Sequence, residues 1–377
     1  MRKKALLALE DGTLFYGHTY SNATMVCGEV VFNTSMTGYQ EICSDPSYIN
    51  QIVLFTTAHV GNVGANQYDN ESDKTWLKGL IVREMAKKSS SWRSEEDFQT
   101  YLEKNNVPWI EGIDTRRLTR HLRNYGSKKG CIMLDNIDED LAVKLAKNHT
   151  NTKDLDLSRE AVKDSEFEWN KTTSYLPSSQ NENKKTVYVY DFGVKSNILR
   201  MLAASDCNVH VIPNHLSIQK ILNDQPDGVI ISNGPGDPAA LQDAIEQVRT
   251  LIYSGIPVLG VCLGCQLIAL AAGGNTKKMK FGHHGANHPV YSFKKRKVYI
   301  TSQNHNFVIN EKTLPGDFVV THVSLFDGSI QGIKSKKFPV SGFQGHPEGS
   351  PGPQDIVEVF DDFFTEVYQR HAARSLN

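Results

Sequence analysis

Short apolar runs alternate with amphipathic stretches through the second half of the chain. The predicted strands cover residues 186–191, 207–212, 228–232 and 256–259, and the predicted helices between them cover 195–204, 217–223 and 239–253. This repeated alternation predicts a mainly parallel sheet with helices on both faces. Further on, residues 281–345 are rich in strand patterns, and residues 355–371 fit a closing helix.

The first half of the chain mixes the two kinds of pattern. Residues 28–34 and 51–56 suggest short strands, and residues 95–105 and 114–124 look helical. Composition changes between about 148 and 185, where the chain becomes polar and acid-rich with little to bury. We therefore expect an α/β protein with a mixed α/β amino-terminal domain (1–150), a linker region (151–185) and an open, mainly parallel-sheet domain (186–377).

Composition narrows the classes of function. A chain of 377 residues with 39% hydrophobic residues can bury the cores of two domains. A formal net charge of -1 provides no overall positive electrostatic field that would attract nucleic acid. The apolar run at 5–9 is too short for a signal peptide, and no run approaches the roughly 20 residues of a membrane helix. Six scattered cysteines are typical of reduced thiols. We expect a cytoplasmic protein with no nucleic-acid or membrane partner.

Residues 260–264 form the most informative motif, with Gly260 and Gly264 on either side of Cys262. A strand turning sharply into a helix needs small residues two before and two after the crest, because the two chains pass closely there. The helix behind the crest points its free N–H groups and positive dipole end at the sulfur, which favours the thiolate. The motif predicts a reactive cysteine; the alternative is an inert buried cysteine.

A thiolate nucleophile needs a base and a group that orients the base. His346 and Glu348 lie two residues apart after an apolar segment, so in an extended chain both side chains face one side. Taken singly, His346 fits a hydrogen-bonded loop histidine and Glu348 a solvated carboxylate. Beside Cys262, they predict a nucleophile, base and orienting acid.

Residues 233–238 contain two glycines and two prolines directly after a predicted strand. Such a run is typical of a tight turn. At the sheet edge that carries Cys262, a glycine N–H can also donate to a tetrahedral oxyanion, together with the N–H of Leu263. The turn is therefore a candidate oxyanion hole.

These three motifs, in this order, resemble the triad-type class I glutamine amidotransferase domain. Other segments resemble the small-subunit family of carbamoyl-phosphate synthetases, and they lie at 33–41, 45–48, 59–64, 112–116, 190–195, 280–285 and 303–305. The resemblance covers nearly the whole chain, apart from residues 148–185. It implies an enzyme subunit that hydrolyses glutamine.

The resemblance implies a defined reaction. Cys262 attacks the side-chain amide of L-glutamine, His346 (oriented by Glu348) protonates the departing ammonia and then activates water, and glutamate leaves. Ammonia passes through a tunnel to a large partner subunit, which uses ATP and Mg²⁺ to make carbamoyl phosphate from bicarbonate for arginine and pyrimidine biosynthesis. Higher-order assembly of such heterodimers is also implied. We expect no cofactor and no metal in this chain, which has no phosphate-binding loop of the Walker type.

The family's glutamine-holding positions also map onto this sequence. They fall on Ser47, Gly234, Gly236, Leu263, Gln266, Asn304, Asn306 and Phe307. Two positions depart from the family's pattern: Cys265 stands where histidine is common, and Asn306 stands where glycine is common. Asparagine tolerates left-handed backbone, so a backbone contact at 306 can survive the change.

Several alternatives stay open at this point. Cys262 and Cys265 form a CxxC pattern, which also occurs in dithiol redox proteins, and with His283 and His284 they offer zinc-ligand types. The domain could serve a different synthetase, or act as an inactive scaffold that needs none of the three catalytic side chains. The basic run 116–123 is either a solvated helix face or a partner contact.

Overall fold

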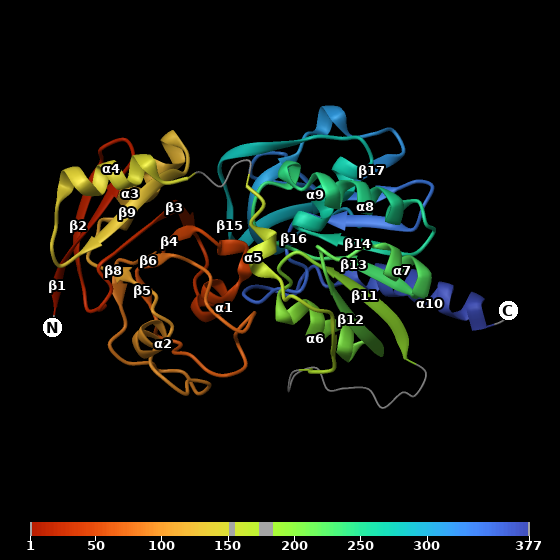
Figure 1. Cartoon of the computed structure of the whole chain (residues 1–377), viewed down its shortest axis with the longest axis horizontal. Helices are drawn as coiled ribbons and strands as arrows, with labels where there is room; N and C mark the ends of the chain where they lie inside the picture. Colours follow the sequence, from red (N-terminus) through yellow and green to blue (C-terminus); the bar gives the residue numbers. More distant parts are fainter. Residues whose placement is uncertain (1, 151–154, 173–183, 376–377) are drawn as a thin grey trace. The chain divides into compact units, whose positions relative to one another are not determined.

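The protein, described by a computed structural model for residues 2–150, 155–172 and 184–375, divides into two compact units (Figure 1). One unit comprises Met1–Lys153 with Lys280–Ala286, and the other comprises Asp154–Met279 with Asn287–Asn377. These bounds differ from the expected ones in two places. The described part of the expected linker, 155–172, groups with the second unit, whereas residues 280–286 group with the first. The remainder of the expected linker, 151–154 and 173–183, lies outside the described residues.

The amino-terminal unit is built on a mixed sheet. Its strands lie in the order β2 (Leu14–Thr19), β1 (Lys3–Leu9), β9 (Lys128–Leu134), β3 (Met25–Asn33), β4 (Gln51–Phe55), β6 (Gly79–Ile81) and β8 (Trp109–Ile110). Strands β3, β4, β6 and β8 are parallel neighbours, whereas β9 pairs antiparallel with both β1 and β3. A separate parallel pair joins β5 (His59–Val60) to β7 (Glu84–Met85).

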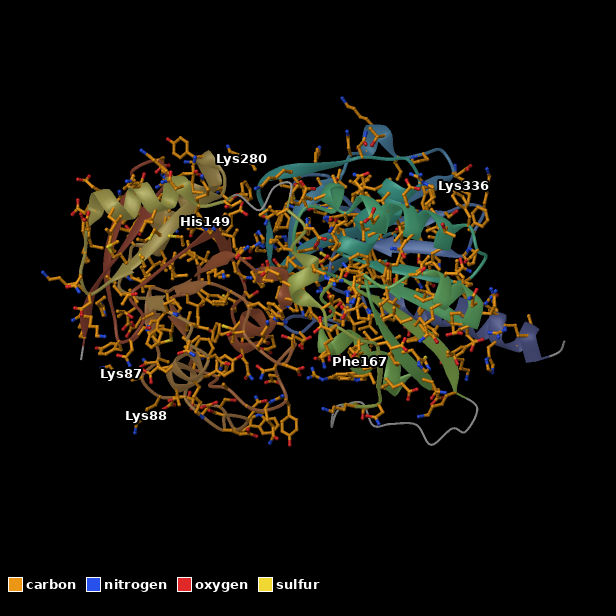
Figure 2. The ribbon with its side chains drawn as sticks, in the orientation of Figure 1. Lys87, Lys88, His149, Phe167, Lys280 and Lys336 are labelled. Atoms are coloured by element: carbon orange, nitrogen blue, oxygen red, sulfur yellow. The ribbon has the colours of Figure 1, made fainter. Side chains whose placement is uncertain are left out.

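Helices cover both faces of this sheet. Alternate residues of each strand point to opposite faces, so each face has apolar side chains that a helix can bury. The helical elements are α1 (Tyr39–Ser44), η1 (Pro46–Tyr48), α2 (Phe98–Lys104), α3 (Thr115–Tyr125) and α4 (Glu139–Asn148). Side chains of α1 and α2 pack with Val31 and Val53, and α4 packs with Ala8 of the same face. Helix α3 packs Leu118 and Leu122 on the other face. Charged side chains such as Lys87 and Lys88, after β7, stay exposed (Figure 2).

The second unit contains a long sheet with a parallel core. Its strands lie in the order β10 (Phe167–Trp169), β12 (Cys207–Pro213), β11 (Lys185–Asp191), β13 (Gly228–Ile231), β14 (Val258–Val261), β19 (Val340–Phe343), β18 (Ile330–Ser335), β17 (Phe318–Ser324), β15 (Thr276–Ser292) and β16 (Lys297–Ile309). The run from β12 to β19 is parallel, and β10 and β18 join its ends antiparallel. Strand β10, which carries Phe167 (Figure 2), thus extends the sheet from within the expected linker.

Helices also sandwich this parallel core. The helical elements are α5 (Ser158–Ala161), α6 (Ser196–Ala204), α7 (Gln219–Asp224), η2 (Pro238–Ala240), α8 (Gln242–Ile252), α9 (Leu263–Ala271), η3 (Glu311–Thr313) and α10 (Glu358–Ser375). Tyr188 and Tyr190 of β11 pack with α7, α8 and α9, whereas Val187 and Val189 pack with α6 and α10. The expected α/β class, with a mixed first unit and a mainly parallel second one, is confirmed.

Most elements lie where the sequence predicts them, and the shifts occur mainly at element ends. The basic run 116–123 forms α3, whose Leu118 and Leu122 are buried and whose arginines are exposed. The apolar run 5–9, considered above only as a leader segment, is the buried strand β1. No helix among the residues that the structure describes is long and apolar enough to span a membrane.

Candidate active site

Four neighbouring parallel strands of the second unit end at the same edge of the sheet. After β11 the chain reaches Lys195, after β13 Asn233, after β14 Cys262 and after β19 His346. Because these strands are adjacent in the order β11, β13, β14, β19, their carboxyl-terminal loops lie side by side. In open parallel sheets this edge is where ligands bind. The topology therefore brings the three predicted motifs together.

Cys262 occupies a strained turn between β14 and α9. Its backbone has φ 51° and ψ −103°, a conformation that a non-glycine residue adopts only when its surroundings enforce it. The Cys262 N–H donates to Phe343 O at 2.9 Å, which ties the turn to the end of β19. The Cys262 side chain is 3% exposed, and its thiol lies 3.5 Å from Asn304 O. The predicted elbow is present, with its sulfur pointing into the site.

The two glycines of the elbow allow this turn through close backbone contact. A Cβ atom on Gly260 would lie 2.5 Å from the Gly264 carbonyl carbon, and one on Gly264 would lie 2.1 Å from Ile231 O. Real Cβ atoms do not approach backbone atoms so closely. The sequence predicts glycine at both positions because the two chains pass closely there. The structure has this close passage.

His346 is held by Glu348 at the end of β19. Its Nδ1–H donates to Glu348 Oε1 at 2.7 Å, and both side chains are almost fully buried. The other ring nitrogen, Nε2, is buried and has no hydrogen-bond partner within 2–150, 155–172 and 184–375. The Cys262 sulfur interacts with this imidazole. A nitrogen left open beside a cysteine sulfur is the arrangement that a general base requires.

A buried lysine completes this group of charges. Lys195 Nζ donates to Glu348 Oε1 at 2.9 Å and to Gly349 O at 2.7 Å, and Lys195 is 1% exposed. The Lys195 backbone N–H donates to Asn233 Oδ1 at 3.1 Å, which links it to the loop after β13. In the sequence, Lys195 ends a segment that resembles the family, but no role was expected for its side chain. Its complete burial against Glu348 is visible only in the structure.

In this group, burial and the neighbouring charges shift the pKa values of Glu348 and His346 in opposite directions. Burial raises the pKa of Glu348, but the neighbouring Lys195 ammonium and the His346 ring more than offset this, and the pKa of Glu348 is held below its usual range. Burial lowers the pKa of His346, but the Glu348 carboxylate outweighs it and raises that pKa. Glu348 is therefore a stable carboxylate that fixes the orientation of the imidazole and favours its charged form.

A chain of amides lies beside Cys262. Gln266 Nε2 donates to Phe307 O at 2.7 Å and to Gln344 Oε1 at 3.1 Å, and Gln344 Nε2 lies 3.8 Å from Cys262 Sγ. Predicted residues Gln266, Asn304 and Phe307 thus gather around Cys262, as does Gln344. No role was expected for Gln344, and its only sequence signal is its place two residues before His346.

The loop after β13 supplies the candidate oxyanion hole. Gly236 has φ +94°, in the left-handed region that favours glycine, and a Cβ on Gly234 would lie 2.3 Å from Phe192 O. That same Cβ would lie 2.9 Å from the Leu263 side chain, so the loop contacts the start of α9. Leu263 is the first residue of α9, and its N–H has no acceptor within the helix.

Two predicted glutamine-holding residues lie differently from the others. Ser47 belongs to the amino-terminal unit, in η1, where it is 7% exposed and its N–H donates to Asp45 Oδ1 at 2.9 Å. Asn306 lies within β16 and does not have the positive φ that we considered for it. Without a positive φ, the backbone at Asn306 gives no conformational reason for glycine at this position.

The open alternatives for Cys262 and Cys265 gain no support. Both are free thiols, and they pack in different apolar clusters: Cys262 with α6 and α10, Cys265 with α7 and α8. Burial raises the pKa of the Cys265 thiol, which disfavours its thiolate. His283 and His284 belong to the other unit, and the described residues contain no cluster of three or more side chains suited to a metal.

Comparison with known proteins matches two family models to different parts of the chain. The family described as "Glutamine amidotransferase class-I" matches residues 188–366, and "Carbamoyl-phosphate synthase small chain, CPSase domain" matches residues 7–132. The carbamoyl phosphate synthase small chain of Vibrio parahaemolyticus is 47% identical over 99% of this chain and 100% of the relative. The chain belongs to the carbamoyl phosphate synthase small chain family. The small chains of Thioalkalivibrio sulfidiphilus and Escherichia coli K12 are 49% and 47% identical over 95% and 98% of this chain, and over 96% and 98% of their own lengths.

This membership confirms the resemblance drawn from the sequence. A class I glutamine amidotransferase domain follows a domain specific to carbamoyl phosphate synthase small chains. The predicted enzyme class, a subunit of a glutamine-hydrolysing carbamoyl phosphate synthase, is confirmed as well.

The first prediction concerns the elbow. In Gly264→Ala, the added methyl group collides with the Ile231 carbonyl, so we expect the free energy of unfolding to fall by roughly 1–3 kcal/mol and Cys262 to be displaced. Chemical denaturation measures the first effect, and the rate of thiol alkylation at Cys262 measures the second. Gly316→Ala is the matched control, because a Cβ there meets nothing within 4 Å. Equal stability of the two variants would contradict the close-contact account.

The second prediction concerns Lys195. In Lys195→Met the aliphatic stem remains but the cation is lost, so the pKa values of Glu348 and His346 both rise. Because Glu348 then accepts a proton at a higher pH, the acid limb of the pH profile of glutamine hydrolysis should move to higher pH. We expect kcat/KM to fall about 10-fold or more.

Lys337→Met is the matched control for this change. Lys337 pairs with Asp317 at 2.8 Å, but both side chains are more than half exposed, so the pair contributes little. The control should keep the wild-type pH profile. An unshifted acid limb in Lys195→Met would show that Lys195 does not tune this pair.

Proposed function

We propose that this subunit hydrolyses L-glutamine through a Cys262 thioester and delivers the ammonia to a large, ATP-using partner subunit. The observation that carries the proposal is the pairing of His346 with Glu348 at 2.7 Å, with the second imidazole nitrogen left open beside a strained, buried cysteine. What distinguishes this open nitrogen from those of other buried histidines is the Cys262 sulfur beside it. The domain-level family membership supports the choice of glutamine as substrate.

In the first half-reaction, the Cys262 sulfur attacks the side-chain carbonyl carbon of glutamine. The carbonyl oxygen gains the negative charge and accepts hydrogen bonds from the backbone N–H groups of Leu263 and of the loop at Gly234–Gly236. The tetrahedral adduct then collapses: the carbon–nitrogen bond breaks, and the imidazolium Nε2–H of His346 gives its proton to the leaving nitrogen. The products of this step are ammonia and a glutamyl thioester on Cys262.

In the second half-reaction, neutral His346 removes a proton from water. The resulting hydroxide attacks the thioester carbon, the carbon–sulfur bond breaks, and glutamate leaves while the Cys262 thiolate returns. Glu348 stays ionised throughout, because Lys195 and His346 hold its pKa below the usual range. Its constant negative charge stabilises the imidazolium that forms in each half-reaction.

Substrate recognition uses the polar groups around the nucleophile. We assign the glutamine-holding role to Gly234, Gly236, Leu263, Gln266, Asn304, Asn306 and Phe307, and also to Ser47 of the amino-terminal unit. Gln266 supports this assignment indirectly, because its amide fixes the Phe307 carbonyl at 2.7 Å. His305 acts in the same way, since its ring nitrogens bridge Phe307 O and Gln303 Oε1 at 2.9 and 3.1 Å.

The remaining chemistry belongs to the partner. The large subunit uses ATP and Mg²⁺ to join ammonia, received through a tunnel, to bicarbonate, and this chain carries no cofactor or metal of its own. The product, carbamoyl phosphate, supplies arginine and pyrimidine biosynthesis in the cytoplasm, and heterodimers can assemble further. The amino-terminal domain supports the choice of synthetase, because its family is specific to carbamoyl phosphate synthase small chains.

Glutamine hydrolysis by wild type and by Cys262→Ser tests the proposal. We expect Cys262→Ser to lose glutamate release by more than about 100-fold, since a serine hydroxyl beside His346 is a far weaker nucleophile than the thiolate. The assay is run on the subunit alone and in complex with a carbamoyl phosphate synthase large subunit, bicarbonate and ATP. Wild type should drive glutamine-dependent carbamoyl phosphate formation, and the variant should support it only from added ammonia.

Cys207→Ser is the matched control. Cys207 is 3% exposed like Cys262, but it begins β12, at the opposite end of the parallel strands. The control should keep the wild-type rate. Wild-type hydrolysis by Cys262→Ser would overturn the thiolate mechanism, and hydrolysis without any glutamine-dependent carbamoyl phosphate would overturn the partnership.

A further inference from the structure

Two cysteines of the amino-terminal sheet face each other across neighbouring strands. Cys27 of β3 and Cys131 of β9 are direct partners in the antiparallel register, and both are free thiols. The glutamine site in the second unit uses neither. On the other side of Cys131, the partner in β1 is Ala8. The three residues therefore form one row across the sheet.

The hydrogen-bond pattern shows that Cys27 and Cys131 form a non-hydrogen-bonded pair, the type in which opposite Cα atoms lie closer together. The Leu134 N–H donates to Thr24 O at 2.7 Å, which makes Thr24 and Leu134 a hydrogen-bonded pair of this ladder. The two types of pair alternate along an antiparallel ladder. Cys27 and Cys131 lie three positions further along the register, so they form a non-hydrogen-bonded pair.

This position suits a disulfide. Non-hydrogen-bonded partners have Cα atoms about 4.5 Å apart, within the range of about 4.4–6.8 Å that disulfides span. The two side chains also lie on the same face of the sheet, because direct partners always do. The two thiols are also near enough for each to affect the pKa of the other.

The two thiols differ in access. Cys131 is 0% exposed, whereas Cys27 is partly exposed. Met25, two positions before Cys27 on the same strand, is 50% exposed. The pairing of β3 with β4 begins only at Glu29, so within the described chain Cys27 has a paired strand on one side alone. The neighbouring Cys131 thiol also lowers the pKa of Cys27, whereas the Cys27 thiol and burial raise the pKa of Cys131. Cys27 is therefore the thiol that meets an oxidant first.

We propose that Cys27 and Cys131 form a thiol–disulfide exchange site that takes a small-molecule disulfide such as oxidised glutathione. The Cys27 thiolate attacks one sulfur of glutathione disulfide, the sulfur–sulfur bond breaks, and one glutathione leaves. The Cys131 thiol then loses its proton and attacks the Cys27 sulfur of the mixed disulfide, which releases the second glutathione. Two cysteine thiols are oxidised and one glutathione disulfide is reduced to two thiols. The site is independent of glutamine hydrolysis.

Peptide mapping of the full chain tests the site. The fully reduced protein is incubated with glutathione disulfide, quenched with an alkylating reagent, digested and analysed by mass spectrometry. We expect the peptides that contain Cys27 and Cys131 to be joined, with a mass about 2 Da below their sum, and to separate after reduction. The oxidised protein should also unfold at a midpoint higher by on the order of 5 °C, because the bond restricts the unfolded chain.

Single variants separate the two roles. Cys131→Ser should accumulate the glutathione adduct on Cys27, because no second thiol displaces it, whereas Cys27→Ser should leave Cys131 free. Cys43→Ser is the control, since Cys43 is 0% exposed in the apolar cluster that includes α1 and α2, and its replacement should leave the crosslink intact. Wild-type protein whose Cys27 and Cys131 both remain alkylated as free thiols would overturn the proposal. So would a stable Cys27 adduct in wild type, because Cys131 would then fail to resolve it.

Discussion

The close contact between β14 and α9 determines the geometry around Cys262 in the second unit. Gly260 and Gly264 lie so near the neighbouring backbone that no side chain fits at either position. This contact lets the chain turn from strand to helix within one residue, and the turn leaves Cys262 with φ 51°. The strain at Cys262 costs of order 1–3 kcal/mol, and the buried packing of α9 against β13 and β14 offsets it. A relaxed turn would carry the sulfur away from His346.

A second constraint is the burial of charge. Lys195, His346 and Glu348 are each about 1% exposed, and an isolated ion in such a place would be strongly destabilised. Each compensates another: Glu348 accepts from both His346 and Lys195 through the same oxygen, and Lys195 also donates to Gly349 O. The group is thus stable only as a unit. That interdependence explains why the base can stay aligned without solvent contact.

Much of this arrangement follows from local sequence. The alternation of apolar runs gives the parallel order from β11 to β14, and that order places the loops at Asn233 and Cys262 side by side. The spacing of His346 and Glu348 predicts their pairing on an extended chain, but the structure forms the pair across a turn, in which the Gly349 N–H donates to His346 O at 3.1 Å. The spacing of Gly260 and Gly264 predicts the tight turn, because chains that pass this closely leave no room for a Cβ atom.

Other features depend on contacts between distant segments, which local pattern does not encode. The pairing of Lys195 with Glu348 joins residues 153 positions apart, and the contact of Gln344 with Gln266 joins residues 78 apart. Asn306 lies in β16 without a positive φ, so the tolerance of asparagine for left-handed backbone, which the sequence analysis considered, is not used there. Residues 155–172 looked too polar to pack, yet Phe167 and Trp169 supply enough apolar surface for β10 to join the sheet edge. A few aromatic residues in a polar segment were sufficient.

The central claim is that the Cys262 sulfur becomes covalently linked to the substrate. Rapid acid quenching during glutamine turnover, followed by mass spectrometry of the peptide that contains Cys262, tests it most directly. The account predicts a glutamyl adduct on Cys262 that appears within a single turnover and is absent from Cys262→Ser. Turnover without any adduct on Cys262, or with the adduct on another cysteine such as Cys265, would contradict it.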